Sequence, residues 1–145
     1  MNELAHFRAT MLARHIEAEQ AFVHGDPQPR MALWSRRDPV TLFGAIGMSE
    51  SGWDHLGQTF PWVASRFSEV SDYRIDIELV EVSGDLAYVL WFERCNVSIA
   101  GRPVEPVTVR VTHIYRREDG EWKIVHRHAD IPPTGQPLRA GPSTE

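Results

Sequence analysis

The chain has 145 residues, of which 42% are hydrophobic, and a formal net charge of −5. This length and composition suit one domain with a substantial apolar core. The acidic balance argues against non-specific binding to nucleic acids or to membrane surfaces, because both need a basic face. The single cysteine, Cys95, excludes an internal disulfide and a cysteine zinc cluster. The sequence shows neither a secretory signal pattern nor an apolar run of membrane-spanning length, so we expect a cytoplasmic protein.

The first half of the chain predicts helices. Apolar residues recur at helical spacing over residues 3–24, and Gly25-Asp26-Pro27 ends that helix. Pro61 is expected to kink or restart a later helix. The expected elements of this half are helices at 3–24, 27–34 and 53–67, a strand at 40–43 and a loop at 44–52.

After Ser71 the apolar repeat changes from that of a helix to that of a strand. Helices followed by antiparallel strands predict an α+β fold. We expect one domain over residues 1–131, and a flexible tail over residues 132–145. The expected strands run through 73–79, 86–99, 104–117 and 121–131, with turns at 83–85, 100–101 and 118–120.

Turn geometry sets the strand register, and the register decides which side chains share a face. A three-residue turn at Glu118–Gly120 brings several polar residues together with Trp91. This predicted face is apolar at one end and ionisable at the other, which indicates a pocket wall. The alternative is a buried salt-bridge network that only orders the sheet. The face comprises Ile75, Ile77, Trp91, Glu93, Arg110, Thr112, His126 and His128.

The last turn leaves a second register open. A two-residue turn at Asp119-Gly120 would place His113 beside His126, and Arg110 on the opposite face. His126-x-His128 is also a loose metal-binding pattern, which Glu93 or Asp130 could complete. Because a third ligand at a defined spacing is lacking, we predict no metal.

The first helix carries polar residues within its apolar arc. His15 and Glu19 are one helical turn apart and would point toward the sheet. They either line the same pocket, or His15 is a satisfied core residue while Glu19 and Arg8 bend out to solvent.

Further candidates lie near the first strand. Asp38, followed by Pro39, is either a general base or a simple turn residue. Tryptophans more often build the core, but they also make rigid apolar pocket walls. The candidate aromatic wall consists of Trp34, Trp53, Trp62 and Trp91, and Phe43 is a further candidate binding residue.

Three segments, "WSRRDPVTLFG", "GWDHLGQTFPWVASRF" and "VTHIYRREDGEWKIVHRHAD", resemble the nuclear-transport-factor-2-like superfamily. The likeness covers residues 3–131 and is nearest to the SnoaL-like, ketosteroid-isomerase-like group. It implies a cone-shaped, strongly curved antiparallel sheet wrapped around helices, a pocket inside, and often a dimer on the outer face. Asp38 matches the position of the isomerases' base, but the first helix lacks their tyrosine and offers His15 instead. The dehydratase branch implies roles for His126, His128 and Asp38.

Two functions follow as expectations. The first is a cofactor-free isomerase, dehydratase or cyclase for a small apolar carbonyl or polyketide-like compound. His126 or His128 would shuttle a proton, and Arg110, oriented by Glu93, would stabilise an oxyanion. The second is a non-catalytic ligand-binding or protein-association domain of the same fold.

The central strand also predicts a homodimer. Leu90 and Phe92 alternate with Val89 and Trp91, so the strand is apolar on both faces. Helices cover one face, and we expect a second copy of the chain to cover the outer face.

Overall fold

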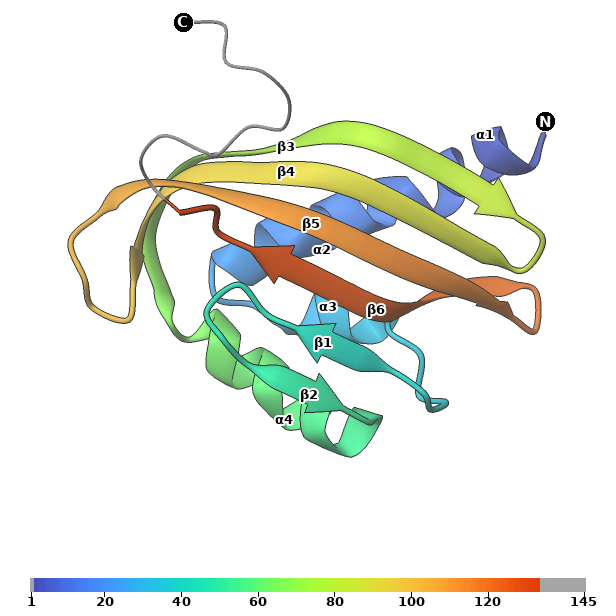
Figure 1. Cartoon of the computed structure of the whole chain (residues 1–145), viewed down its shortest axis with the longest axis horizontal. Coiled ribbons are helices and arrows are strands. Elements are labelled where there is room, and N and C mark those ends of the chain that lie inside the picture. The colour runs from blue at the N-terminus through green and yellow to red at the C-terminus, as the bar shows by residue number, and fades with distance from the viewer. Residues whose placement is uncertain (1, 134–145) are drawn as a thin grey trace, which may run out of the picture.

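The computed structural model describes residues 2–133, which form helices laid against one six-stranded sheet (Figure 1). Most of the tail predicted to be flexible, residues 134–145, lies outside the described residues. None of the described helices combines the length and apolar character that a membrane crossing needs. In chain order the elements are α1 (Glu3–Phe7), the π-helical η1 (Arg8–Leu12), α2 (Ala13–Val23), α3 (Gln28–Leu33), β1 (Thr41–Phe43), β2 (Ser49–Ser51), α4 (Trp53–Ala64), β3 (Phe67–Ser83), β4 (Leu86–Ile99), β5 (Glu105–Glu118) and β6 (Glu121–Asp130).

The first helix forms as its sequence pattern predicts. The side chain of Asn2 caps it by accepting a hydrogen bond from the Ala5 amide at 2.7 Å. α1, η1 and α2 follow one another without a break, and Gly25, with φ of 97°, stands just beyond their end. Their apolar residues face the sheet and include Phe7, Met11, Leu12, Ala18 and Phe22, all buried.

The sheet has the strand order β2-β1-β6-β5-β4-β3. Its long strands are antiparallel, but β1 pairs with β6 in parallel, so the sheet is mixed rather than wholly antiparallel. Within the described residues it stays open, with β2 and β3 as its edges. The α+β class and the curved sheet are therefore confirmed. β2 was predicted as loop, because its sequence Ser-Glu-Ser carries no apolar alternation.

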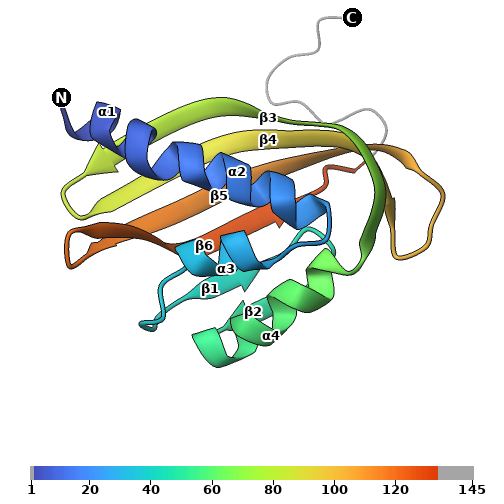
Figure 2. The same ribbon diagram turned by 180° about the vertical axis from the view of Figure 1, so that it is seen from behind.

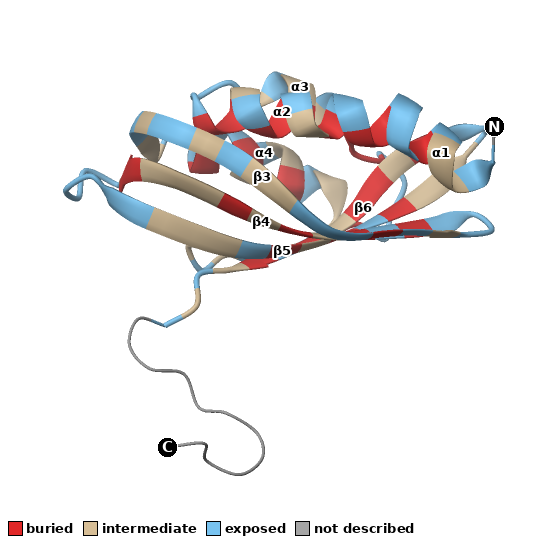
Figure 3. Cartoon of the chain, turned by 90° about the horizontal axis from the view of Figure 1, so that it is seen from above, coloured by how far each residue is buried: buried red, intermediate tan, exposed pale blue. Residues whose placement is uncertain are grey.

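The helices cover one side of the sheet, here called the inner face (Figure 2). The buried residues of helices and strands lie between these two layers (Figure 3). β3 bends strongly toward α4, where Glu69 and Asp72 have left-handed φ angles of 53° and 56° at shifts of its register. Such bulges bend a strand, and here they give the sheet its hollow. The opposite side of the sheet is the outer face.

Pro61 was expected to kink α4 or to restart it. The helix does not restart there, and one unbroken helix runs through Pro61 to Ala64. Phe67, which was predicted to end this helix, begins β3 instead. The buried residues Leu56, Phe60 and Val63 hold α4 against the rest of the core.

The register of the last hairpin corrects the predicted face. Glu118 pairs with Glu121, so the turn has two residues, Asp119 and Gly120, both at positive φ (51° and 79°). This is the alternative turn; the three-residue turn was wrong. The pattern is that of a type I′ turn, in which glycine and aspartate are common.

A bulge at Val125 then shifts the pairing by one residue. Tyr115 pairs with Ile124, whereas Ile114 pairs with His126 and leaves Val125 unpaired. An extra residue reverses the alternation of side chains beyond it. Ile124 therefore faces inward before the bulge, and Arg127 faces inward after it. The prediction that His126 and His128 share the inner face with Trp91 is wrong.

Candidate functional site

A small cavity of about 50 Å³ lies between the helices and the inner face of the sheet. Its polar lining consists of Arg30, Glu93 and Arg127, which form its floor. The remaining walls are apolar, so the cavity pairs a carbon-binding wall with ionisable groups, as small-molecule sites do. The apolar and glycine lining comprises Phe22, Val23, Leu42, Gly44, Ala45, Ile46, Met48, Phe60, Val63 and Phe67.

The first polar unit of the floor is a buried ion pair. Arg127 on β6 donates to Glu93 on β4, from Nη1 to Oε2 at 3.0 Å and from Nη2 to Oε1 at 3.3 Å. The Trp91 indole N–H donates to the same Oε2 at 2.9 Å. These contacts fix the position of the carboxylate between the guanidinium and the indole.

The second unit centres on Glu19 of the long helix. Its Oε2 accepts two hydrogen bonds from Arg30, at 2.8 and 2.5 Å. Its Oε1 lies 2.7 Å from His15 Nε2, and His15 Nδ1 lies 2.7 Å from the Tyr115 hydroxyl. All four side chains are buried, so this chain of hydrogen bonds crosses the core from helix to sheet.

His113 lies between the two units. Its Nε2 is 3.2 Å from Arg127 Nη1 and 3.7 Å from Glu19 Oε1. Because a guanidinium can only donate, Nε2 accepts and the ring carries its proton on Nδ1. Among the described residues that buried Nδ1 has no hydrogen-bond partner. By the same reasoning His15 donates from Nε2 to Glu19 and accepts from Tyr115 at Nδ1.

Burial and charge together set the protonation of this cluster. Burial lowers the pKa of His15, and it lowers that of His113 further, with help from His15 and Arg127. Burial alone would raise the pKa of Glu19, but Arg30, His15 and Arg127 outweigh it and hold that pKa well below the usual range. Two carboxylates therefore face two guanidiniums beside two neutral imidazoles, and the cluster as a whole is neutral.

The cluster also contains the one group of three possible metal ligands in the described residues. Ligand atoms of His15, Glu19 and His113 lie within 4.8 Å of one another. Arg127 Nη1 already lies 3.2 Å from His113 Nε2 and 3.7 Å from Glu19 Oε1. A cation would have to displace this guanidinium and share the space with Arg30, so the residues fit an arginine-filled centre better than a metal.

The structure brings four predicted residues together here. His15 and Glu19 both point inward, so the interpretation that Glu19 bends out to solvent is wrong. Glu93 joins the floor, and Trp91 supports it with a ring centroid 5.0 Å from that of His15. Trp34 is buried in the core against Phe60 instead of lining the cavity.

Five other predicted residues lie on the outer face. Thr112 pairs with His128, which is next to Phe43, and Arg110 pairs with Asp130 at 2.6 Å. The Thr41 hydroxyl meets His126 Nδ1 at 2.6 Å, in the same layer. A shallow hollow of about 500 Å³ adjoins His128 and Arg110 there, apart from the buried cluster. The geometric argument for catalysis by His126, His128 and Arg110 in an inner pocket is thus lost.

Asp38 and Trp53 also lie away from the floor. Asp38 is exposed and accepts a hydrogen bond from the Trp53 amide at 3.1 Å, which caps the start of α4. The Trp53 ring stacks under the Arg36 guanidinium, 3.5 Å from the ring centroid. The turn interpretation fits this position of Asp38 better than a buried base.

Sequence reasoning missed Arg30, Arg127 and Tyr115 as members of the cluster. The two-residue turn did point to His113, but it placed that residue beside His126, whereas the structure pairs His113 with Arg127. The Val125 bulge that turns Arg127 inward leaves no local signal in the sequence. Arg30 stacks on Phe22 at 3.4 Å and reaches Glu19 from α3, a contact between helices that no spacing pattern shows.

A model of the SnoaL-like domain matches residues 9–133. Similar solved structures include a candidate dehydratase of the NTF2-like family from Streptomyces avermitilis (18% identity, 90% of this chain and 98% of that chain, TM-score 0.70). Another is a candidate calcium/calmodulin-dependent protein kinase type II association domain from Thiobacillus denitrificans (20% identity, 86% and 96%, TM-score 0.68). A third is an NTF2-like protein of unknown function from Pseudomonas putida (22% identity, 89% and 86%, TM-score 0.65). None of the curated proteins matches the chain.

Proposed function

The chain belongs to the SnoaL-like domain family, and we propose that it is a cofactor-free acid–base enzyme for a small, mostly apolar carbonyl compound. The observation that carries this proposal is the Glu93–Arg127 pair on the floor of an apolar cavity. The neutral charge of the cluster suits an uncharged reacting group. Next to a carbonyl group, isomerisation, dehydration and cyclisation can each proceed through an enolate, which a base and a guanidinium on such a floor would form and stabilise.

Glu93 is the candidate base. In the described part of the chain its Oε1 accepts a single hydrogen bond, at 3.3 Å from Arg127, so it keeps a free lone pair. It would take a proton from the carbon next to the carbonyl. Arg127 would donate to the enolate oxygen that forms, the role first given to Arg110. Return of the proton to another carbon completes an isomerisation.

Hydrogen–deuterium exchange tests this chemistry without knowledge of the substrate. A panel of small cyclic ketones and enones is incubated with the protein in D₂O, and deuterium next to the carbonyl is measured by NMR. We expect exchange with at least one compound, and a loss of about a hundredfold or more in Glu93→Gln. Asp130→Asn, which removes an exposed carboxylate of the outer face, is the matched control and should keep the full rate.

Exchange that is equally fast in Glu93→Gln would overturn the role of Glu93. Thermal unfolding and circular dichroism establish that each variant is folded. Should Glu93→Gln not fold, Glu93→Asp withdraws the carboxylate by one methylene and should still slow exchange.

The second candidate function is binding or association without chemistry. Two observations favour it: the cavity of about 50 Å³ is smaller than ordinary ligand sites, and the carboxylates are already paired. One structural neighbour is named as a candidate association domain. Absence of exchange across the panel, together with saturable binding of any of these compounds, would favour this function.

We also propose a homodimer through the outer face. Side chains of five strands meet there in one row, Leu79, Leu90, Thr112, His128 and Phe43, which are neighbours in the strand register. Next to this row lie the exposed Tyr88 and Ile114. A second copy would cover this apolar surface.

A further inference from the structure

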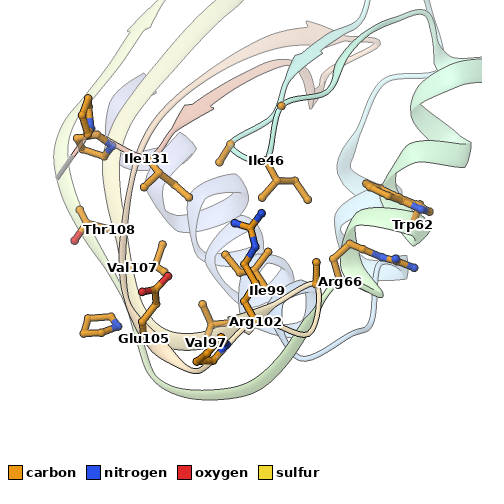
Figure 4. A pocket seen from close by; sticks show the side chains of 17 residues that line it. Ile46, Trp62, Arg66, Val97, Ile99, Arg102, Glu105, Val107, Thr108 and Ile131 are labelled. Atoms are coloured by element: carbon orange, nitrogen blue, oxygen red, sulfur yellow. The ribbon is translucent and has the colours of Figure 1, made fainter.

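A larger groove lies beside the cavity, with a volume of about 840 Å³. Its walls are the end of α4, the β4–β5 hairpin, the loop between β1 and β2, and residues 131–133 (Figure 4). Its volume falls in the range of sites that hold drug-sized ligands. Much of its lining is apolar and includes Ile46, Trp62, Val97, Ile99, Val107 and Ile131.

The groove and the cavity share a wall. Ala45 and Ile46, in the loop that joins β1 to β2, line both spaces. This loop is held by hydrogen bonds from the Gly44 amide to the Met48 carbonyl (2.8 Å) and from the Gly47 amide to the Gly44 carbonyl (3.0 Å). A molecule lying in the groove therefore has the polar floor of the cavity as its neighbour across a single short loop.

Two arginines give the groove a positive character. Arg66 extends along Trp62, 4.8 Å from its ring centroid, and the Arg102 side chain extends toward Ile46 (Figure 4). Among residues 2–133, Arg66 and Arg102 form no ion pair, and Glu105 is the single acidic residue lining the groove. Most of the other described arginines pair with carboxylates, whereas Arg8, Arg14 and Arg36 form no ion pair but do not line the groove. The paired ones are Arg30, Arg37, Arg74, Arg94, Arg110, Arg116, Arg117 and Arg127.

The other charged clusters differ from this one. The buried floor is neutral, because its guanidiniums already bind Glu19 and Glu93. The exposed outer-face pair of Arg110 and Asp130 is likewise matched. Unmatched arginines over an apolar trough complement an anion that carries a hydrocarbon body.

We propose that the groove binds an elongated apolar molecule with an anionic end, a carboxylate or a phosphate, held by Arg66 and Arg102. This inference rests on the proposed function, because it makes the groove the place where the remote part of the substrate lies. The uncharged reacting part would then enter beside Glu93. Binding energy from a remote anionic end is a general means of positioning a reacting group.

Three amphiphiles of equal chain length test the proposal: dodecanoate, dodecan-1-ol and dodecyltrimethylammonium, each below its aggregation concentration. Dissociation constants are measured by titration calorimetry, and the Trp62 indole N–H signal locates the site by NMR. We expect dodecanoate to bind about fivefold or more tightly than the alcohol, and the cation to bind weakest. Dodecyl phosphate distinguishes a carboxylate from a phosphate as the anionic end of the ligand. A lower Kd for dodecyl phosphate than for dodecanoate would indicate that the groove prefers a phosphate.

The double variant Arg66→Gln/Arg102→Gln should bring the Kd of dodecanoate to that of the alcohol. Arg8→Gln, which removes an exposed arginine of the long helix, is the matched control and should keep the preference. Added salt should narrow this head-group preference in the unaltered protein, because Arg102 is exposed and Arg66 is partly exposed to solvent. Equal binding of all three amphiphiles, no binding, or a preference that survives the double variant would each overturn the proposal.

The two proposals can fail separately. Loss of head-group preference with deuterium exchange intact refutes the groove site alone. Head-group preference without any exchange refutes the acid–base chemistry and leaves a binding protein with an anion-selective groove.

Discussion

Arg127 on β6 donates hydrogen bonds to both carboxylate oxygens of Glu93 on β4, although β5 lies between these strands. The pair is buried, so each charge depends on the other for its solvation. The Trp91 indole and His113 complete the hydrogen bonds around it. Removing one partner leaves an uncompensated charge in the core, whereas removing both does not.

A double-mutant cycle in urea should show this dependence. Arg127→Met is expected to lower the free energy of unfolding by about 3–5 kcal/mol, because it strands the Glu93 carboxylate. The double variant Glu93→Leu/Arg127→Met should be more stable than that single variant. Arg110→Met, which breaks an exposed pair, should cost less than about 1 kcal/mol. Strictly additive losses would mean that the buried pair does not act as a unit.

The buried histidines predict a loss of stability in mild acid. The folded pKa of both His15 and His113 lies below the unfolded value of 6.5. The unfolded chain therefore takes up protons first, and the free energy of unfolding falls as the pH drops below about 6.5. Glu19 adds a second loss below its unfolded value of 4.5, since its folded pKa is also lowered.

Variants of His113 separate this effect from general acid denaturation. Urea unfolding of His113→Gln between pH 7 and 5 should show a shallower dependence on pH than the unaltered protein. His55→Gln, a change at an exposed histidine of α4, serves as control and should keep the original slope. An unchanged slope in His113→Gln would contradict a buried neutral imidazole at this position.

Much of the fold follows from periodicity. The long helix and the four long strands are where the apolar repeat predicts them, because burial of one face sets that repeat. The predicted pairing of Ile77 with Trp91 is confirmed. The turn between β3 and β4 consists of Gly84 and Asp85 instead of being centred on Gly84, which shifts the pairing by one residue. A bulge at Glu78 shifts the pairing back, so that Ile77 still lies opposite Trp91. The bulge in β3 thus kept the predicted pairing, whereas the bulge at Val125 of β6 turned His126 and His128 to the outer face. Arg110 and Thr112 lie on that face because Trp91 pairs with Val111.

The site was harder to predict because its members come from separate elements. His15 and Glu19 are one helical turn apart, so their pairing was visible in the sequence. The contact of Glu19 with Arg30 depends on how α3 packs against α2. Its contact with Arg127 depends on the bulge at Val125, which turns Arg127 toward the inner face. A strand with a bulge carries no marker when the extra residue is apolar, as Val125 is.

Chemical labelling distinguishes the two faces of β6 directly. His128 is exposed, whereas His15 and His113 have no accessible surface. Diethyl pyrocarbonate followed by peptide mass spectrometry should modify His128 early and leave the two buried rings unmodified until the protein unfolds. Rapid labelling of His113 with protection of His128 would restore the register that the sequence first suggested.

If the outer face forms a homodimer, a charge introduced on that face should convert the dimer to a monomer. Light scattering at micromolar concentration should give twice the chain mass. Ile114→Glu places a charge in the middle of the outer face and should give the monomer mass without unfolding the chain. His55→Glu is the matched control, because it adds a charge on α4, away from that face. A monomer mass for the unaltered protein would refute the dimer.

Gly44 lies at the start of the loop between cavity and groove, and we expect its substitution to lower the stability of the protein. A Cβ built there would lie 1.9 Å from the Met48 sulfur, so Gly44→Ala must push the Met48 side chain out of the cavity wall. Such overpacking costs about 1–3 kcal/mol in stability. Adding Met48→Ala should recover part of that loss, since it removes the colliding side chain. Gly57→Ala in α4 is the matched control, because its nearest contact, to Trp53 at 3.4 Å, is ordinary. If Gly44→Ala and Gly57→Ala have equal effects in urea unfolding, Met48 does not pack over Gly44 and the wall between cavity and groove is not built as described.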